Sequence, residues 1–134
     1  MSENKIQHPA PLNTAYKETI FEFAADVRPS DFWLITAYNP DGKNTDEISN
    51  HLADEKLHAE LVALGVEPFR VTGLSPDRTH AEPGWGAALD EETAMNFGRK
   101  FRQDAIFHFQ EGEIWLVNCM DGSSEALDHS VRRF

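Results

Sequence analysis

The pattern of apolar and polar positions predicts two strands of different kinds near the start of the chain. Thr19 to Ala24 alternates with a period of two, which is typical of a strand buried on one face. Phe32 to Tyr38 is apolar at nearly every position, as in a central strand covered on both faces. We expect these two strands to pair. The Asn-Pro-Asp-Gly turn that follows reverses the chain.

A long helix is predicted from Asn44 to Gly65. Asn44 and Glu47 resemble a capping box, and Gly65 supplies a left-handed stop. Two apolar strips run along this helix, so we expect it to be sandwiched between other elements. The first strip contains Ala53, Leu57, Leu61 and Leu64 with Asn50 among them, and the second contains Ile48, Leu52, Ala59 and Ala63.

The remaining stripe of this helix carries Glu47, His51, Asp54 and His58. Two imidazoles and a carboxylate at this spacing could hold a divalent metal. The alternative is a solvated acidic face. We favour the acidic face and predict no metal and no cofactor, because a metal site needs further ligands that the sequence does not reveal.

The second half of the chain predicts two more strands, a helix and a hairpin. A short strand runs from Phe69 to Gly73, residues 74–86 form a long surface loop, and Trp85 to Leu89 begins another strand. Asp90 caps a helix that ends in basic residues, and a hairpin turns at residues 111–112. The predicted fold is therefore α+β, with a mixed or mainly antiparallel sheet of about five or six strands, two main helices and a C-terminal β-hairpin. Residues 1–134 form a single domain, with 1–10 and 120–134 as peripheral tails.

Composition narrows the function. The chain has 134 residues, and 12 Lys and Arg against 23 Asp and Glu give a net charge of −11. Such a surface repels nucleic acid directly and attracts basic proteins. Cys119 is the single cysteine, and the first residues do not resemble an export signal, so we expect a cytoplasmic protein without a membrane span. Gly-rich phosphate loops, cysteine pairs and a nucleophile elbow are absent, so the sequence favours a binding protein over an enzyme.

Polar residues at the end of the buried strand suggest a ligand site. Thr36, Tyr38 and Asn39 follow one another at the carboxyl end of this strand, where sheets of this kind often bind ligands. His80 and Glu82 lie in the predicted loop, but no base, nucleophile and oxyanion donor can be assembled from them. We therefore predict no catalytic residue.

Several segments resemble a bacterial family of small domains of unknown function. The resemblance rests on LNTAY (12–16), ITAYNP (35–40), Asn50, Gly73, Trp85 and RQDAI (102–106). It implies a shared fold and a possible pocket of Tyr38, Asn39, Asn50 and Trp85. It implies no activity.

By type, the chain also resembles the small acidic inhibitors of phages and mobile elements, including anti-CRISPR proteins. This resemblance implies a DNA mimic that occupies the basic groove of a nucleic-acid-binding protein or CRISPR effector subunit. Two alternatives stay open: a small ligand-binding or enzymatic domain with a pocket at the end of strand 32–38, and an accessory protein-interaction domain. The carboxylates expected to bind the partner are Asp41, Asp46, Glu47, Asp54, Glu55, Asp90, Glu91 and Glu92.

Overall fold

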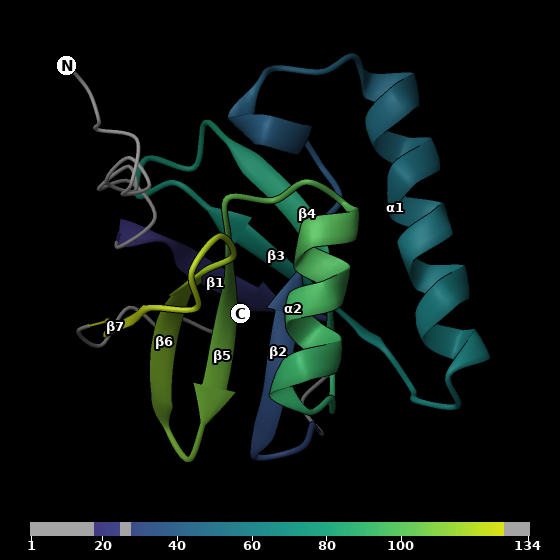
Figure 1. Ribbon diagram of the computed structural model, residues 1–134. Helices are drawn as coiled ribbons and strands as arrows, with labels where there is room; N and C mark the ends of the chain where they lie inside the picture. The colour runs from purple at the N-terminus through teal and green to yellow at the C-terminus, as the bar shows by residue number, and fades with distance from the viewer. Residues whose placement is uncertain (1–17, 25–27, 128–134) are drawn as a thin grey trace, which may run out of the picture.

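The computed structural model describes residues 18–24 and 28–127, which form an α+β fold with two helices on one face of a curled antiparallel sheet (Figure 1). The sheet has seven strands in the order β1-β3-β4-β2-β5-β6-β7, more than the five or six expected. The strands are β1 (Ile20–Phe23), β2 (Asp31–Ile35), β3 (Phe69–Leu74), β4 (Ala81–Ala87), β5 (Ala105–Gln110), β6 (Glu113–Asn118) and β7 (Ser124–Ala126). The helices are the short 3-10 helix η2 (Pro40–Gly42), α1 (Glu47–Ala63) and α2 (Glu91–Lys100).

Strand β2 occupies the centre of the sheet, as its continuous apolar sequence predicts. Phe32 and Leu34 belong to a core cluster on one face, whereas Trp33 and Ile35 belong to the cluster under the helices. Side chains alternate between the two faces of a strand, so a strand buried on both faces must be apolar throughout. β2 ends at Ile35, so the residues from Thr36 onward lie beyond the carboxyl end of the strand.

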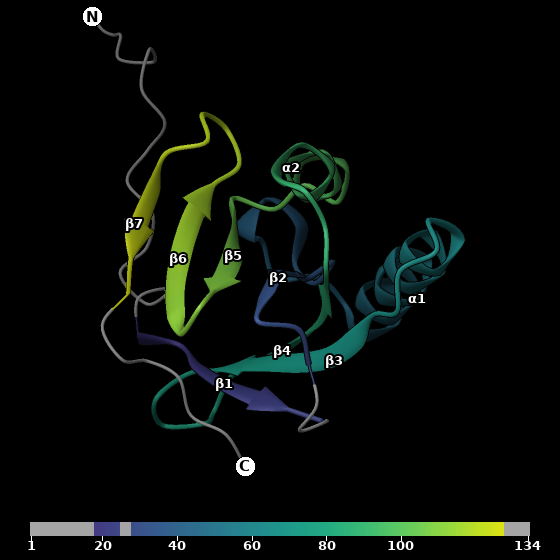
Figure 2. The same cartoon turned by 90° about the horizontal axis from the view of Figure 1, so that it is seen from below.

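The concave face of the curled sheet is filled largely by phenylalanine rings. Figure 2 shows that β1, β3 and β4 run in a different direction from β5, β6 and β7. The sheet therefore curls, and its two halves face each other across the concave side. Phe21 on β1 meets Phe107 and Phe109 on β5 edge to face, with ring centroids 5.0 and 5.1 Å apart. These contacts hold the curl, because aromatic pairs of this geometry add to the stability gained from burial alone.

The expectation that the first two strands pair is wrong. β1 pairs with β3, and β2 lies between β4 and β5. The expected long loop at 74–86 is also wrong in its second half, because β4 begins at Ala81 and its residues 81–86 pair with β3. The Pro and Gly residues of β4 weakened the strand pattern in the sequence. Glycine is nevertheless favoured where the backbone of a neighbouring strand approaches closely. A Cβ on Gly84 would lie 2.8 Å from the carbonyl oxygen of Ile35.

The main helix is confirmed, but its start and its outer face differ from expectation. Asp46 is the N-cap residue, and its carboxylate accepts a hydrogen bond from the backbone of Ser49 at 2.8 Å, so the capping expected at Asn44 is wrong. Gly65 has φ 92°, the left-handed stop that was predicted. The second apolar strip is not sandwiched, because Ile48 is 73% exposed and Leu52 is 60% exposed.

The predicted C-terminal hairpin is confirmed, with β5 and β6 paired along their length and His108 opposite Trp115. Asp90 caps α2 as expected. Part of the expected tail 120–134 forms β7, which pairs with the edge of β6. Segment 1–10, the LNTAY segment and the basic end of the chain lie outside the described residues.

Candidate functional site

A cleft of two adjoining cavities lies at the carboxyl end of β2. One cavity, of about 300 Å³, is lined mostly by apolar groups, and the other, of about 450 Å³, is polar. His80, Glu82 and Gln103 line both, so they stand between the apolar and the polar half of the cleft. The apolar cavity is also lined by Thr19, Leu34, Thr36, Gly73, Leu74, Ser75, Ala105 and Phe107, and the polar cavity by Tyr38, Asn39, Gly42, Asn44, Thr79, Ala81 and Asp104.

Glu82 is the half-buried carboxylate at the junction of the two cavities. It lies in β4 opposite Gly73 of β3, where the absence of a side chain on the partner strand leaves room beside it. Burial raises the pKa of Glu82, and a hydrogen bond from Asn39 Nδ2 to Oε2 at 3.0 Å partly offsets that effect. No residue in the described part of the chain donates to its other oxygen, Oε1. A carboxyl group with a raised pKa in a cleft is a recurrent feature of functional sites.

Asn39 connects this carboxylate to the start of α1. Its backbone is left-handed, with φ 50° and ψ 60°, a conformation that asparagine tolerates better than most residues. Its backbone N–H donates to Asn50 Oδ1 at 2.8 Å, and its own Oδ1 accepts from Asn50 Nδ2 at 3.1 Å and from the backbone of Thr45 at 3.1 Å. The amide of Asn39 is therefore fixed, and it presents its Nδ2 donor to Glu82.

Gln103 is oriented in the same way by the backbone around it. Its Nε2 group donates to the carbonyl oxygens of Tyr38 at 3.2 Å and Phe101 at 3.1 Å. Both donor hydrogens are thereby used, and its Oε1 atom accepts from no residue that the structure describes. Thr36 is also satisfied, since its hydroxyl donates to Pro83 O at 2.8 Å and accepts from the backbone of Tyr38 at 3.1 Å.

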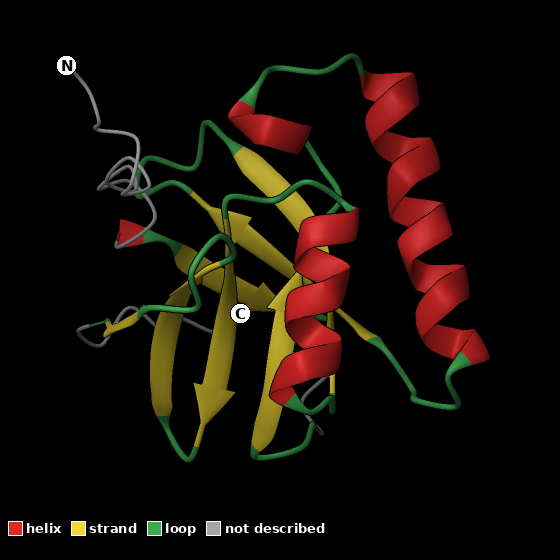
Figure 3. Cartoon of the chain, in the orientation of Figure 1, coloured by secondary structure: helices red, strands yellow, loops and turns green. Residues whose placement is uncertain are grey.

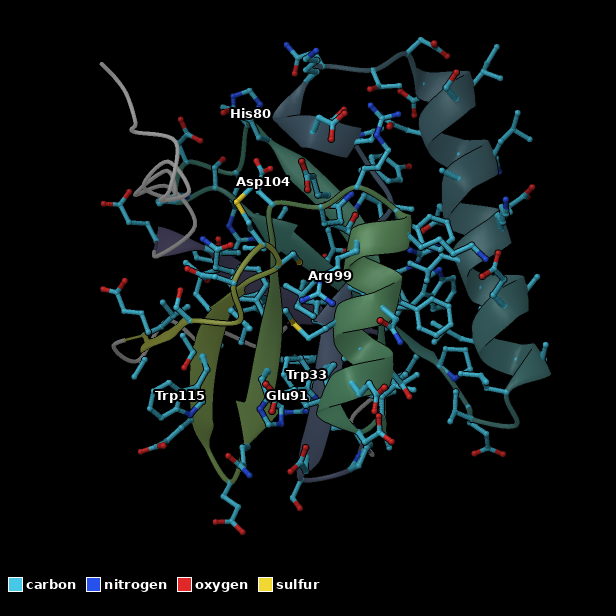
Figure 4. The ribbon with its side chains drawn as sticks, in the orientation of Figure 1. Trp33, His80, Glu91, Arg99, Asp104 and Trp115 are labelled. Atoms are coloured by element: carbon cyan, nitrogen blue, oxygen red, sulfur yellow. The ribbon has the colours of Figure 1, made fainter. Side chains whose placement is uncertain are left out.

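His80 and Asp104 both line the polar cavity. Figure 4 shows both at the same end of the sheet, His80 at the β3–β4 turn and Asp104 just before β5. Both side chains are exposed. The β3–β4 turn is stiffened by Asp77, whose carboxylate accepts hydrogen bonds from Ser75 and Thr79 at 2.8 Å each. The hydrogen bond from the Thr79 backbone, together with these two side-chain hydrogen bonds, lowers the pKa of Asp77 to about 2.

The predicted pocket of four residues is only partly assembled. Tyr38 and Asn39 line the polar cavity, whereas Asn50 and Trp85 do not. Trp85 packs beneath α1, where its Nε1 donates to the carbonyl oxygen of Asp54 at 3.3 Å and the Arg70 guanidinium lies 3.8 Å from its ring centroid. Asn50 supports the cleft indirectly, through its hydrogen bonds to Asn39. The sequence analysis did not place Glu82 and Gln103 in the pocket, because they meet at the end of β2 only after β4 and β5 pair with β2 on either side.

The phenol of Tyr38 belongs to a residue of the polar cavity and is affected by charged groups of α1 and β3. Burial raises the pKa of Tyr38, and the negative charges of Asp54 and Glu47 raise it further, while the positive charge of Arg70 lowers it. The phenol therefore stays protonated and can donate a hydrogen bond.

The acidic residues expected to bind a partner do not form one cluster of free surface carboxylates. Asp54 is 3% exposed and forms a bidentate pair with Arg70 at 2.8 and 2.9 Å, so the expectation that it presents charge on the surface is wrong. Asp41 is ion-paired with Arg102. Asp46 and Asp90 are exposed but serve as helix caps.

The remaining acidic residues of that set lie on two separate helix ends and one helix side. Glu47 is in the first turn of α1, and Glu91 and Glu92 are in the first turn of α2. α1 begins at the upper end of the helical layer in Figure 1 and α2 at its lower end. Glu55 lies between them on α1, 3.2 Å from His51. The two acidic helix starts are therefore separated by the length of the layer.

The side chains of α1 that were considered as metal ligands, His51, Asp54 and His58, have separate partners in the structure. Asp54 turns toward Arg70, and the His58 ring packs on Trp85 with centroids 4.3 Å apart. Among the described residues, no group of three or more His, Cys, Asp or Glu side chains is placed to bind a metal ion. Within residues 18–24 and 28–127, no helix is both long and apolar enough to cross a bilayer.

Comparison with known proteins identifies the family. The family described as "Protein of unknown function (DUF3293)" matches residues 35–106, more than half of the chain, so the chain belongs to it. The chain is also 29% identical over 126 residues to the glucose-6-phosphate isomerase of Caulobacter sp. (strain K31). That similarity covers 84% of this chain and 23% of the isomerase, so the chain spans about a quarter of that protein's length. No solved structure matches the chain.

Proposed function

We propose that this protein is a small-molecule-binding domain whose ligand occupies the cleft at the carboxyl end of β2. The observation that carries the proposal is Glu82, a half-buried carboxylate held by Asn39 at the junction of an apolar and a polar cavity. Ligand sites are typically concave and largely apolar, with a few fixed polar groups that orient the ligand. The cleft has this composition.

The residues on which the family resemblance rests support the same location. Thr36, Tyr38 and Asn39 come from the ITAYNP segment, and Gln103 comes from RQDAI. These segments are more than sixty residues apart in the sequence, yet all four residues line the cleft. Gly73 lines it as well.

The similarity to a glucose-6-phosphate isomerase does not support isomerase activity for this chain. Cationic side chains such as arginine and lysine are the usual partners of a sugar phosphate's phosphate group. Neither lining of the cleft contains a lysine or an arginine among the described residues. We therefore do not extend that protein's activity to this chain.

A thermal-shift screen of common metabolites tests the proposal. A ligand that binds only the folded state stabilises it by RT ln(1 + [L]/Kd), about 2.7 kcal/mol at a hundredfold excess over Kd. We expect saturable stabilisation by at least one compound. Leu74→Trp, which enlarges a half-buried residue of the apolar cavity, should remove the shift while the unliganded variant stays folded.

The matched control is Leu64→Trp, a similar enlargement on an exposed residue at the end of α1, which should leave the shift unchanged. A flat screen contradicts the proposal. So does a stabilising compound whose effect survives in Leu74→Trp, because that compound binds elsewhere.

A second candidate function is protein interaction through the outer face of α1. Ile48 and Leu52 are 73% and 60% exposed, are one helical turn apart, and lie on the side of the helix opposite its buried residues. Contiguous exposed apolar side chains often mark interaction sites. Under this candidate, Leu52→Ser removes binding of a partner and leaves ligand-induced stabilisation intact.

The hypothesis of a DNA mimic has less support, and it stays a prediction. Its carboxylates are divided between the two ends of the helical layer, and Asp54 is removed from the surface by Arg70. The net charge of −11 still favours basic partners. Neutralising Glu47, Glu91 and Glu92 together should abolish inhibition of a DNA-binding partner if the hypothesis holds. Full inhibition by that variant would refute it.

A further inference from the structure

Three side chains of the cleft lining offer hydrogen-bond acceptors that the described residues do not use. Glu82 Oε1 and Gln103 Oε1 accept from no described residue, and the Asp104 carboxylate has no hydrogen bond or ion pair within the described part of the chain. Both amide hydrogens of Gln103 and the hydroxyl of Thr36 are used inside the protein, and Asn39 gives one of its two amide hydrogens to Glu82. The Tyr38 phenol remains a donor in the polar cavity. A ligand that placed its own acceptors against these three acceptor side chains would leave both sides unpaired. The cost is about 1–3 kcal/mol for each buried polar group left unpaired.

The electrostatic surroundings favour a cation at the same place. The described lining of the two cavities contains the carboxylates of Glu82 and Asp104 and no lysine or arginine. The whole chain carries −11, so its field attracts a small cation and repels a small anion. His80 also lines both cavities, and its side chain is exposed to water.

The adjoining cavity defines the other end of the ligand. Leu34, Leu74 and Phe107 line a space of about 300 Å³ directly beside Glu82. Apolar surface buried there contributes about 25 cal/mol per Å², without need for a polar partner. A ligand with one apolar end and one donor-bearing end would satisfy both halves of the cleft at once.

We infer that the cleft selects an organic ammonium compound, with its apolar group in the cavity of Leu34, Leu74 and Phe107 and its ammonium group on Glu82. This inference rests on the proposed function and adds the chemical class of the ligand. Asn39 holds Oε2 of Glu82, so the ammonium group meets Oε1, with Gln103 Oε1 as a second acceptor.

Three probes with the same phenyl group separate the charge requirement from the apolar one. These are phenethylamine, which is an ammonium ion at neutral pH, the neutral phenethyl alcohol, and the anion hydrocinnamate. Titrations followed by amide NMR report both affinity and location. We expect saturable shifts with phenethylamine at residues of the cleft such as Thr36, Gln103 and Phe107, weaker shifts with the alcohol, and none with the anion.

Glu82→Gln tests the assigned contact, since it keeps the shape and an acceptor for Asn39 but removes the charge. We expect the affinity for phenethylamine to fall roughly ten- to a hundredfold, as for other hydrogen bonds to charged groups. Glu113→Gln, the same change on an exposed residue of β6, should leave it unchanged. The affinity for phenethylamine should also weaken as the pH is lowered through the pKa of Glu82, because protonation removes the carboxylate charge.

The outcomes distinguish this inference from the proposed function. Binding of hydrocinnamate or the alcohol in the cleft as tightly as phenethylamine overturns the ammonium preference but supports a ligand cleft. An unchanged affinity in Glu82→Gln overturns the contact. Binding of none of the three probes overturns the inference, and the metabolite screen then decides whether the cleft binds another class.

Discussion

Replacing Asp54 by alanine should destabilise the protein strongly. The Asp54 carboxylate lies on the buried face of α1 and accepts two hydrogen bonds from Arg70, at 2.9 and 2.8 Å. Arg70 also packs over the Trp85 ring and donates to the carbonyl oxygen of Gly84 at 3.2 Å. The group therefore joins α1 to β3 and β4. Its removal leaves a guanidinium ion without its counterion.

The magnitude follows from the burial of the two partners. Breaking a buried ion pair by removing one partner costs about 3–5 kcal/mol. The Arg70 side chain is 31% exposed and can regain some water, so we expect the lower end of this range, about 3 kcal/mol. Asp54→Asn keeps the shape and one acceptor, and should cost less, about 1.5 kcal/mol.

Urea denaturation with linear extrapolation measures these free energies of unfolding. The matched control is Glu60→Ala, which removes the more exposed pair between Glu60 and Lys100 at 2.7 Å, and should cost under about 1 kcal/mol. If Asp54→Ala costs no more than Glu60→Ala, the reasoning about this buried pair is wrong.

Three further predictions concern the fold. Burial raises the pKa of Cys119 to about 11, so the thiol should react with a thiol reagent at neutral pH only when the protein unfolds; rapid labelling of the native protein contradicts this. Gly84→Ala should cost about 2–3 kcal/mol in a urea titration, because its Cβ would lie 2.8 Å from Ile35 O, and an unchanged midpoint argues against the close approach. Asp46→Ala should lower the melting temperature more than Asn44→Ala, because Asp46 caps α1; the reverse order would place the cap at Asn44.

Much of the fold could be predicted from local patterns. The apolar run of β2, the hairpin of β5 and β6, and the capped α2 each carry their signal within a few adjacent residues. Strand pairing could not be predicted in the same way. The position of β1 beside β3 depends on how Phe21 and Phe23 pack across the concave face, which no local pattern reports.

The site was predictable in place but not in composition. The carboxyl end of β2 suggested Tyr38 and Asn39, and both line the cleft. Glu82 was assigned to a loop, because Pro83, Gly84 and Gly86 obscured the pattern of β4. Asp54 showed the opposite error, since its spacing placed it with exposed residues, whereas Arg70 holds it in the interior.

The most direct test of the account is the ionisation of the Glu82 carboxyl group, followed by carbon NMR across a pH titration with and without a stabilising ligand. We predict that the pKa of Glu82 lies above the ordinary value of a glutamate in the free protein, and that its resonance responds when the ligand binds. A Glu82 carboxyl that titrates at the ordinary value and does not respond to the ligand would contradict the central claim.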